Sequence, residues 1–247
     1  MGSLFEKWKK GMKKKVHPFC TAIVPAAGKS SRMGGEDKMF APLCGVPVLA
    51  RTLTVLDQAV LVDEIVVAAQ PEKLEEVAAL VSSAGIRKPV RVVEGGASRA
   101  ESVLLAALEA NEDVEYLAVH DGARPLVLPE QVDNLIRLGQ RTYAVAPAVP
   151  VTDTVKVADL SGLVLSTPDR STLFAVQTPQ VFQANLLKAA LQSAIAAEAP
   201  LTDDCSAVER LGKEVYLTPG WRENIKITTP EDLSVAELFL HRREVQA

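Results

Sequence analysis

Short apolar runs alternate along the chain with longer stretches that repeat apolar residues at helical spacing. The runs are typical of buried β-strands and fall at residues 21–24, 64–69, 89–93, 116–120 and 144–146. The helical pattern occupies residues 46–56, 71–83, 98–110 and 129–138. This alternation predicts an α/β fold, with helices on both faces of a Rossmann-like, mixed but mostly parallel sheet. In such sheets ligands bind outside the carboxyl ends of the strands, so functional residues are expected there.

The pattern changes after residue 149, where strict alternation replaces the helical repeats. Residues 151–157 alternate, Ser161-Gly162 predicts a turn, and residues 163–165 return, which together indicate a β-hairpin. We therefore expect a protruding arm over about residues 149–172. The rest of the chain predicts a helix from Asn185, another after an N-cap at residues 202–204, strands at 215–217 and 225–227, and a last helix from Thr229.

Composition and charge exclude several classes of protein. The chain has 247 residues, 48% of them hydrophobic, which is enough for one domain with a sizeable core. The net charge of −4 argues against a general nucleic-acid binder, although the first 20 residues hold six lysines and one glutamate. We expect residues 1–19 to be a flexible basic tail and residues 20–247 to form a single domain. No secretory signal or membrane-spanning run is found, and three scattered cysteines favour a reduced, cytoplasmic location.

The first strand runs into a glycine-rich and basic loop, residues 24–40, VPAAGKSSRMGGEDKMF. Glycines let backbone N–H groups approach a ligand, and the basic side chains Lys29, Arg32 and Lys38 surround that nest, so the loop predicts polyphosphate binding. It is not a P-loop, because Ile23 stands where that motif needs its first glycine. The glycine spacing also differs from the dinucleotide fingerprint.

Two further strand ends carry candidate chemistry. GGASRAESV, residues 95–103, predicts a helix capped by Ser98 and Glu101, preceded by two glycines that let the backbone approach a ligand. VHDGARP, residues 119–125, places Asp121 and Arg124 at the tip of the fourth strand. Asp121 could bind Mg²⁺, a ribose or hydroxyls, and Arg124 a phosphate, while a local Asp–Arg pair that shapes the turn is the structural alternative. His120 is interpreted as a structural residue.

These motifs together resemble nucleotidyltransferases with a glycosyltransferase-A-like fold, and more narrowly the 2-C-methyl-D-erythritol 4-phosphate cytidylyltransferases. The resemblance rests on six stretches that occur in order between residues 21 and 243. They are AAG…RM…K, GGASRAES, HDGARP, DTVK with DRSTL, TPQVF and NIKIT.

The resemblance implies a role for each matching residue. It implies cytidylyl transfer from CTP to an alditol phosphate, with Mg²⁺ held mainly by the triphosphate and no metal-ligand set in the protein. It also implies a homodimer in which the arm of one subunit completes the site of the other. The implied catalytic cations are Arg32 and Lys38; the implied CTP contacts are Ala26, Ala27, Gly28, Gly96 and Ser102, with Arg99 nearby; and the implied acceptor contacts are Asp121, Arg124, Thr154, Arg170, Thr178 and Lys226.

Several alternatives stay open at this stage. A cytidylyltransferase for ribitol 5-phosphate would share the nucleotide loop and differ around the acceptor. A non-catalytic nucleotide-binding regulator would not need both Arg32 and Lys38. Considered alone, Thr154 fits ordinary strand propensity, Thr178 a turn, and Lys226 the solvent face of a strand.

Overall fold

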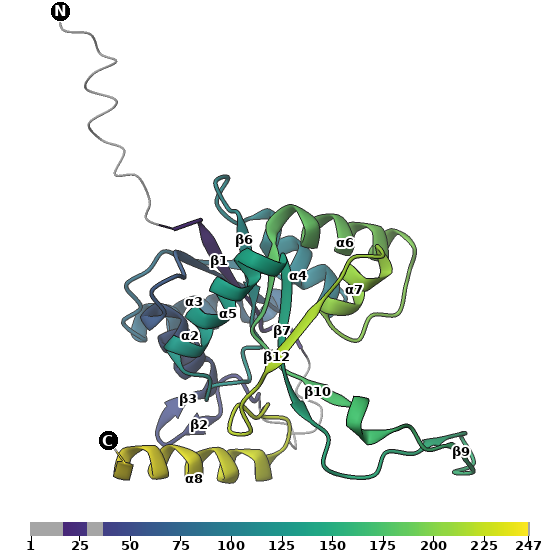
Figure 1. Ribbon diagram of the computed structural model, residues 1–247. Helices are drawn as coiled ribbons and strands as arrows, with labels where there is room; N and C mark the ends of the chain where they lie inside the picture. The colour runs from purple at the N-terminus through teal and green to yellow at the C-terminus, as the bar shows by residue number, and fades with distance from the viewer. Residues whose placement is uncertain (1–16, 29–36, 247) are drawn as a thin grey trace, which may run out of the picture.

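A computed structural model describes residues 17–28 and 37–246 of the chain (Figure 1). Residues 1–16 of the predicted basic tail therefore lie outside the described residues, as do Lys29 and Arg32 of the first loop. The strands are β1 (Cys20–Pro25), β2 (Pro42–Leu43), β3 (Val46–Pro47), β4 (Glu64–Ala69), β5 (Val90–Glu94), β6 (Tyr116–Val119), β7 (Ala144–Pro150), β8 (Val157–Ala158), β9 (Val164–Ser166), β10 (Phe174–Val176), β11 (Gln180–Gln183) and β12 (Tyr216–Pro219).

Helices connect most of these strands. They are α2 (Val48–Gln58), α3 (Leu74–Ser83), α4 (Arg99–Leu108), α5 (Pro129–Thr142), α6 (Ala184–Ala196), α7 (Asp204–Arg210) and α8 (Pro230–Gln246), with short 3₁₀ turns η1 (Pro71–Lys73) and η2 (Arg170–Thr172).

The central sheet is mixed and has the strand order β10-β7-β11-β6-β1-β4-β5, with β12 paired to β7. Strands β6, β1, β4 and β5 are parallel to one another, whereas β11 runs antiparallel to both β6 and β7. The carboxyl ends of β1, β4, β5 and β6 therefore meet at one edge, where a ligand site is expected.

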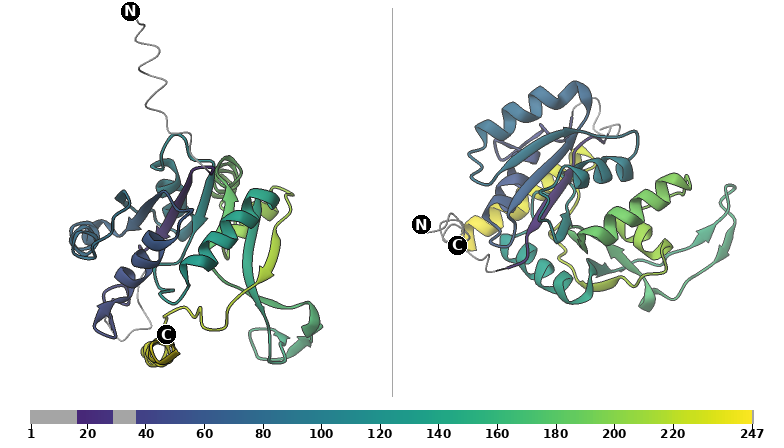
Figure 2. Two further views of the ribbon diagram at one scale, coloured as in Figure 1. Left: turned by 60° about the vertical axis from the view of Figure 1, so that its left-hand side comes forward. Right: turned by 90° about the horizontal axis from the view of Figure 1, so that it is seen from above.

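Alternate residues of the parallel strands enter two separate cores. In β1, Ala22 and Val24 pack in the core beneath α2, α3, α5 and α8, while Ile23 packs in the core beneath α4, α6 and α7. Both faces of the sheet are thus covered, as Figure 2 also shows, which confirms the predicted three-layer α/β/α architecture. Strands buried on both faces read as continuous apolar runs, and this explains why the sequence located them.

The hairpin over residues 157–166 extends away from the rest of the molecule (Figure 1). Its strands are shorter than predicted, because only Val157–Ala158 and Val164–Ser166 pair across the turn. The turn itself is as predicted: Gly162 has φ +89°, and the Asp159 carboxylate accepts bonds from the backbone N–H groups of Ser161 and Leu163.

Two predictions about strands were wrong. Residues 225–227 do not form a strand. The N–H of Ile227 donates instead to the carbonyl of Ala123, in the loop that follows β6. Strand β11 was not predicted, because Thr178-Pro179 was interpreted as a turn ahead of a helix. The helix after it begins at Ala184 with Gln183 as N-cap, and the cap of α7 is Asp203.

Candidate active site

A pocket of about 710 Å³ opens at the carboxyl ends of β1, β4, β5 and β6. It brings together four of the six stretches singled out in the sequence, among them NIKIT from near the end of the chain. Its lining includes Ala27, Gly28, Lys38, Gln70, Gly95, Gly96, Arg99, Ser102, Asp121 and Lys226. Most of the predicted site residues that the structure describes are therefore gathered in one place.

The loop after β1 is held against β4 by backbone and side-chain bonds. The N–H of Ala26 donates to the carbonyl of Ala68 at 2.7 Å, and the amide of Gln70 donates to the carbonyl of Ala27 at 3.0 Å. Ala26 is buried below the pocket, whereas Ala27 and Gly28 line it. A Cβ atom at Gly28 would meet none of the described residues within 4 Å, and Gly28 lines the pocket.

The turn between β5 and α4 needs its two glycines for steric reasons. A Cβ atom at Gly95 would lie 2.7 Å from the Cβ of Ala27, and one at Gly96 would lie 2.4 Å from the Cβ of Glu101. The hydroxyl of Ser102 accepts a bond from Gly96 N–H at 3.1 Å and donates to the carbonyl of Ser98 at 2.8 Å. This buried hydroxyl therefore fixes the turn that forms one wall of the pocket.

The predicted capping box of α4 is only half present. The Ser98 hydroxyl accepts a bond from Glu101 N–H at 3.1 Å, as predicted. The carboxylate of Glu101 instead accepts from Ala97 N–H, one residue before the cap. The turn is too tight at Gly96 for the usual reciprocal bond, since the Glu101 side chain lies directly against that glycine.

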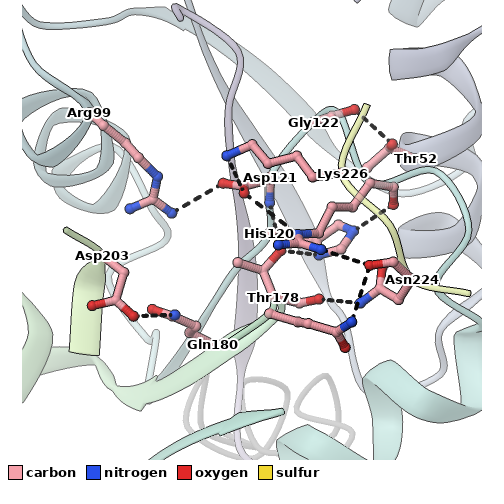
Figure 3. Close-up of polar contacts among 12 residues, drawn as sticks. Thr52, Arg99, His120, Asp121, Gly122, Thr178, Gln180, Asp203, Asn224 and Lys226 are labelled. Atoms are coloured by element: carbon pink, nitrogen blue, oxygen red, sulfur yellow. Dashed lines mark hydrogen bonds and ion pairs between the residues drawn. The ribbon is translucent and has the colours of Figure 1, made fainter. Parts of the chain in front are cut away.

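Asp121 is the centre of a cluster of cations on the pocket wall (Figure 3). Its carboxylate lies 2.8 Å from Nζ of Lys226, 3.3 Å from Nη2 of Arg99 and 3.7 Å from Nε of Arg124. Burial alone would raise the pKa of Asp121, but the three cations outweigh it and hold the pKa well below its usual range. Asp121 is therefore an ionised residue that binds together segments from α4, β6 and the 224–228 region.

Arg124 is the one of these three cations that does not line the pocket. Its Nη1 donates to the carbonyl of Asn224 at 2.7 Å, and its side chain is only 12% exposed. Burial lowers the pKa of Arg124, and its Nε is buried without a hydrogen-bond partner among the described residues. The structure thus places Arg124 as a support for Asp121 and for the 224 segment.

Thr178 and His120 form a buried chain beneath Asp121 (Figure 3). The Thr178 hydroxyl accepts a bond from Asp121 N–H at 3.1 Å and lies 2.9 Å from Nδ1 of His120. The other ring nitrogen, Nε2, lies 3.0 Å from the carbonyl of Arg124. Burial lowers the pKa of His120 to about 4, so the ring is neutral and structural, as the sequence suggested.

The two arm residues lie outside this pocket. Thr154 and Arg170 are exposed, and Nη1 of Arg170 donates to the carbonyl of Thr152 at 2.7 Å within the arm. Neither residue lines the pocket of its own chain.

Sequence reasoning missed one residue next to the site. Asp204, the first residue of α7, is 1% exposed and lies 2.9 Å from Nη2 of Arg99. The sequence showed an acidic residue in the first turn of a helix, which is ordinary. Only the tertiary structure, in which α6 packs against both α4 and α7, reveals the contact.

The described residues contain no group of three or more His, Cys, Asp and Glu side chains that could hold a metal ion. In the same part of the chain, no helix combines the length and the apolar character needed to cross a membrane.

Comparison with known proteins gives a consistent result. Residues 20–242 match the model of the 2-C-methyl-D-erythritol 4-phosphate cytidylyltransferase family. Relatives with that name include one from Nocardia farcinica, 46% identical over 90% of this chain and 94% of its own length. Another, from Bacillus cytotoxicus, is 43% identical over 90% of this chain and 97% of its own.

Solved structures agree with the sequence comparison. The 4-diphosphocytidyl-2C-methyl-D-erythritol synthase of Anaerococcus prevotii superposes with a TM-score of 0.78 at 29% identity, covering 91% of this chain and 99% of its own. The chain belongs to the 2-C-methyl-D-erythritol 4-phosphate cytidylyltransferase family and is a nucleotidyltransferase.

Proposed function

We propose that this enzyme transfers the cytidylyl group of CTP to 2-C-methyl-D-erythritol 4-phosphate, releasing pyrophosphate and 4-diphosphocytidyl-2-C-methyl-D-erythritol. The observation that carries the proposal is the convergence, in one pocket, of the loop after β1, the β5–α4 turn and the Asp121–Lys226 pair, in a chain of this family. The backbone of the loop after β1 and the ammonium of Lys226 thus line one pocket.

The nucleotide half of the site is formed mainly by backbone. Ala27 and Gly28 present the loop after β1, and Gly96 and Ser102 present the turn before α4. Close approach of backbone N–H groups suits a triphosphate and a base edge, and the N-terminus of α4 adds a favourable field for negative charge. Lys38 lies at the same pocket and is the described member of the proposed catalytic pair, with Arg32.

The acceptor half is centred on Lys226 and Asp121. Lys226 lies 2.8 Å from Asp121 and remains 38% exposed toward the pocket, so its ammonium can also contact an acceptor phosphate. Arg124 and Thr178 act behind this pair by holding Asp121 in place. We assign Arg124 and Thr178 to the support of the acceptor site. We assign direct contact with the acceptor to Lys226 and Asp121.

The reaction needs positioning and charge more than proton transfer. An acceptor phosphate oxygen forms a bond to the α-phosphorus, the bond from that phosphorus to the β-phosphate oxygen breaks, and pyrophosphate leaves. The attacking oxygen is already ionised, and the neutral His120 has both ring nitrogens occupied, so no general base is assigned. Catalysis then comes from alignment and from cations that stabilise the growing negative charge.

Magnesium is proposed as the cofactor, held mainly by the triphosphate. Glu72 and Asp121 are acids that line the pocket, and the ionised carboxylate of Asp121 already contacts Lys226 and Arg99. When bound, Mg²⁺ would neutralise charge on the triphosphate oxygens.

We further propose a cytoplasmic homodimer in which the arm of each subunit reaches the site of the other. The arm exposes apolar side chains that nothing in the described part of the chain covers, with Leu160, Leu163 and Leu165 each more than 60% exposed. An apolar surface of this kind on a protruding hairpin suits a second copy of the chain. Thr154 and Arg170, which do not reach their own pocket, would then complete that of the partner.

Pyrophosphate release from CTP and Mg²⁺ tests the proposal, with methylerythritol phosphate and ribitol 5-phosphate assayed side by side. We expect turnover with the first substrate, and a loss of at least about 100-fold in Lys38→Ala, or roughly 3 kcal/mol of transition-state stabilisation. Lys213→Ala, which removes an exposed lysine from the α7–β12 loop, is the matched control and should keep full activity. Turnover with ribitol 5-phosphate alone would identify the rival enzyme, and CTP binding without turnover a regulator.

A further inference from the structure

Arg99 links the nucleotide pocket to a second, buried carboxylate. One atom of its guanidinium, Nη2, lies 3.3 Å from Oδ1 of Asp121 and 2.9 Å from Oδ2 of Asp204. Asp121 lies on the pocket wall, whereas Asp204 lies behind it, on the wall of a smaller cavity of about 310 Å³. Arg99 borders both spaces and separates them.

Asp204 is poorly satisfied for a buried acid. It is 1% exposed, and neither of its carboxylate oxygens has a hydrogen-bond partner among the described residues. Its one ion pair in this part of the chain is with Arg99. Burial raises the pKa of Asp204, while Arg99 opposes that shift. A buried carboxylate with a single cation is a weak source of stability, because desolvation offsets most of the attraction. Such a residue suggests a function beyond folding.

The position of Asp204 is fixed from the sheet. The side chain of Gln180, in β11, donates to Asp203 at 2.8 Å (Figure 3). It also accepts from Cys205 N–H at 3.3 Å, so the two bonds lie on either side of Asp204 in the sequence. Gln180 is itself 1% exposed. The first turn of α7 is thereby attached to a central strand, which holds the backbone that carries Asp204.

The consequence concerns the nucleotide side of the pocket. Arg99 is the first residue of α4, three residues after Gly96, and an unrestrained arginine side chain has about 2 kcal/mol of rotamer entropy to lose on binding. The two carboxylates remove that freedom in advance. In the described part of the chain, Nε and Nη1 of Arg99 have no hydrogen-bond acceptor, so these donors are available to a ligand.

We propose that Asp204 is a positioning residue for nucleotide binding, which holds the guanidinium of Arg99 against Asp121 at the pocket wall. The ligand class is a nucleoside triphosphate, so this inference rests on the proposed function. The alternative is that the ion pair of Asp204 with Arg99 serves only to hold α7 and α4 together in the fold. The two differ in which substrate is affected and in whether the effect passes through Arg99.

The experiment measures CTP affinity with Mg²⁺ by calorimetric titration in the absence of acceptor, and KM for both substrates. Asp204→Asn keeps the shape and removes the charge, and we expect CTP binding about tenfold weaker with the acceptor KM unchanged. In an Arg99→Gln background, Asp204→Asn should produce no further loss. Glu198→Gln, on the wall of the same smaller cavity, is the matched control and should bind CTP normally.

Wild-type CTP affinity in Asp204→Asn would overturn the proposal, as would an equal loss in both substrates or an undiminished loss without Arg99. Asp204→Glu keeps the charge and shifts it by one methylene, so it provides a second measurement if the asparagine variant does not fold. We again expect a loss of CTP affinity with the acceptor KM unchanged, and wild-type CTP affinity would contradict the proposal. Absence of turnover in the wild-type enzyme would instead reject the proposed reaction, while CTP binding would still decide the role of Asp204.

Discussion

The hydroxyl of Thr178 connects the pocket to its buried support, and its removal gives a sharp prediction. Asp121 N–H donates to this hydroxyl, and Nε2 of His120 faces the carbonyl of Arg124. A carbonyl can only accept, so Nε2 carries the ring proton and Nδ1 must accept from Thr178. The direction of every bond is thereby fixed: Asp121 N–H to Thr178, Thr178 to Nδ1, and Nε2–H to Arg124.

Thr178→Val preserves the shape of the side chain and leaves two buried groups unpaired, the N–H of Asp121 and Nδ1 of His120. Thr178 is 4% exposed and His120 is fully buried, so water cannot replace the bonds easily. Each unpaired group costs about 1–3 kcal/mol, and we expect the free energy of unfolding to fall by about 2–4 kcal/mol in total. Thr178→Ser keeps the hydroxyl and loses one methyl group, which predicts a loss of only about 1 kcal/mol.

Urea unfolding followed by circular dichroism measures these differences, and steady-state kinetics adds the functional consequence. We expect Thr178→Val to raise the KM of the acceptor, because the backbone that carries the Asp121 carboxylate loses its anchor, and Thr178→Ser to restore it. If the two variants unfold with free energies within about 0.5 kcal/mol of each other, the hydroxyl does not bridge two buried groups and the reasoning fails.

Three further predictions concern other parts of the molecule. Burial lowers the pKa of His120 from 6.5 to about 4, so between these pH values only the unfolded chain binds the proton. The free energy of unfolding should therefore fall by about 3 kcal/mol as the pH drops from 6.5 to 4. Urea titrations across this range should show a smaller decline for His120→Gln, and an equal decline in both proteins would contradict the assignment. Gly96→Ala would place a methyl group 2.4 Å from the Cβ of Glu101, so the turn must move and CTP should bind about tenfold more weakly by calorimetry with an unchanged acceptor KM; normal CTP affinity would refute this. Leu163→Glu should convert the proposed dimer to an inactive monomer in light scattering, whereas Leu238→Glu, at an equally exposed position on α8, should not; a wild-type mass for the first variant would place the interface elsewhere.

The central layers of the fold could be read from local pattern. Parallel strands buried on both faces need apolar side chains at nearly every position, so β1, β4 and β6 appear as apolar runs in the sequence. The glycines at residues 95–96 and the acid at residue 121 follow such runs directly. Because the ends of neighbouring parallel strands share one edge of the sheet, the sequence also indicated that these motifs would meet.

Other features depended on contacts between residues far apart in the chain. Strand β11 was not recognised, because its antiparallel place between β6 and β7 leaves no mark on its own four residues. Residues 225–227 alternate like a strand but lie against a loop, where Lys226 reaches Asp121.

The same reason explains the partners that the sequence did not reveal. Asp204 looked like an ordinary first-turn acid, and its contact with Arg99 arises only because α7 packs near α4. A local pattern records whether a position is buried and how the backbone turns. Which charged groups then face one another is decided by tertiary packing, since the distance between two side chains depends on every element between them.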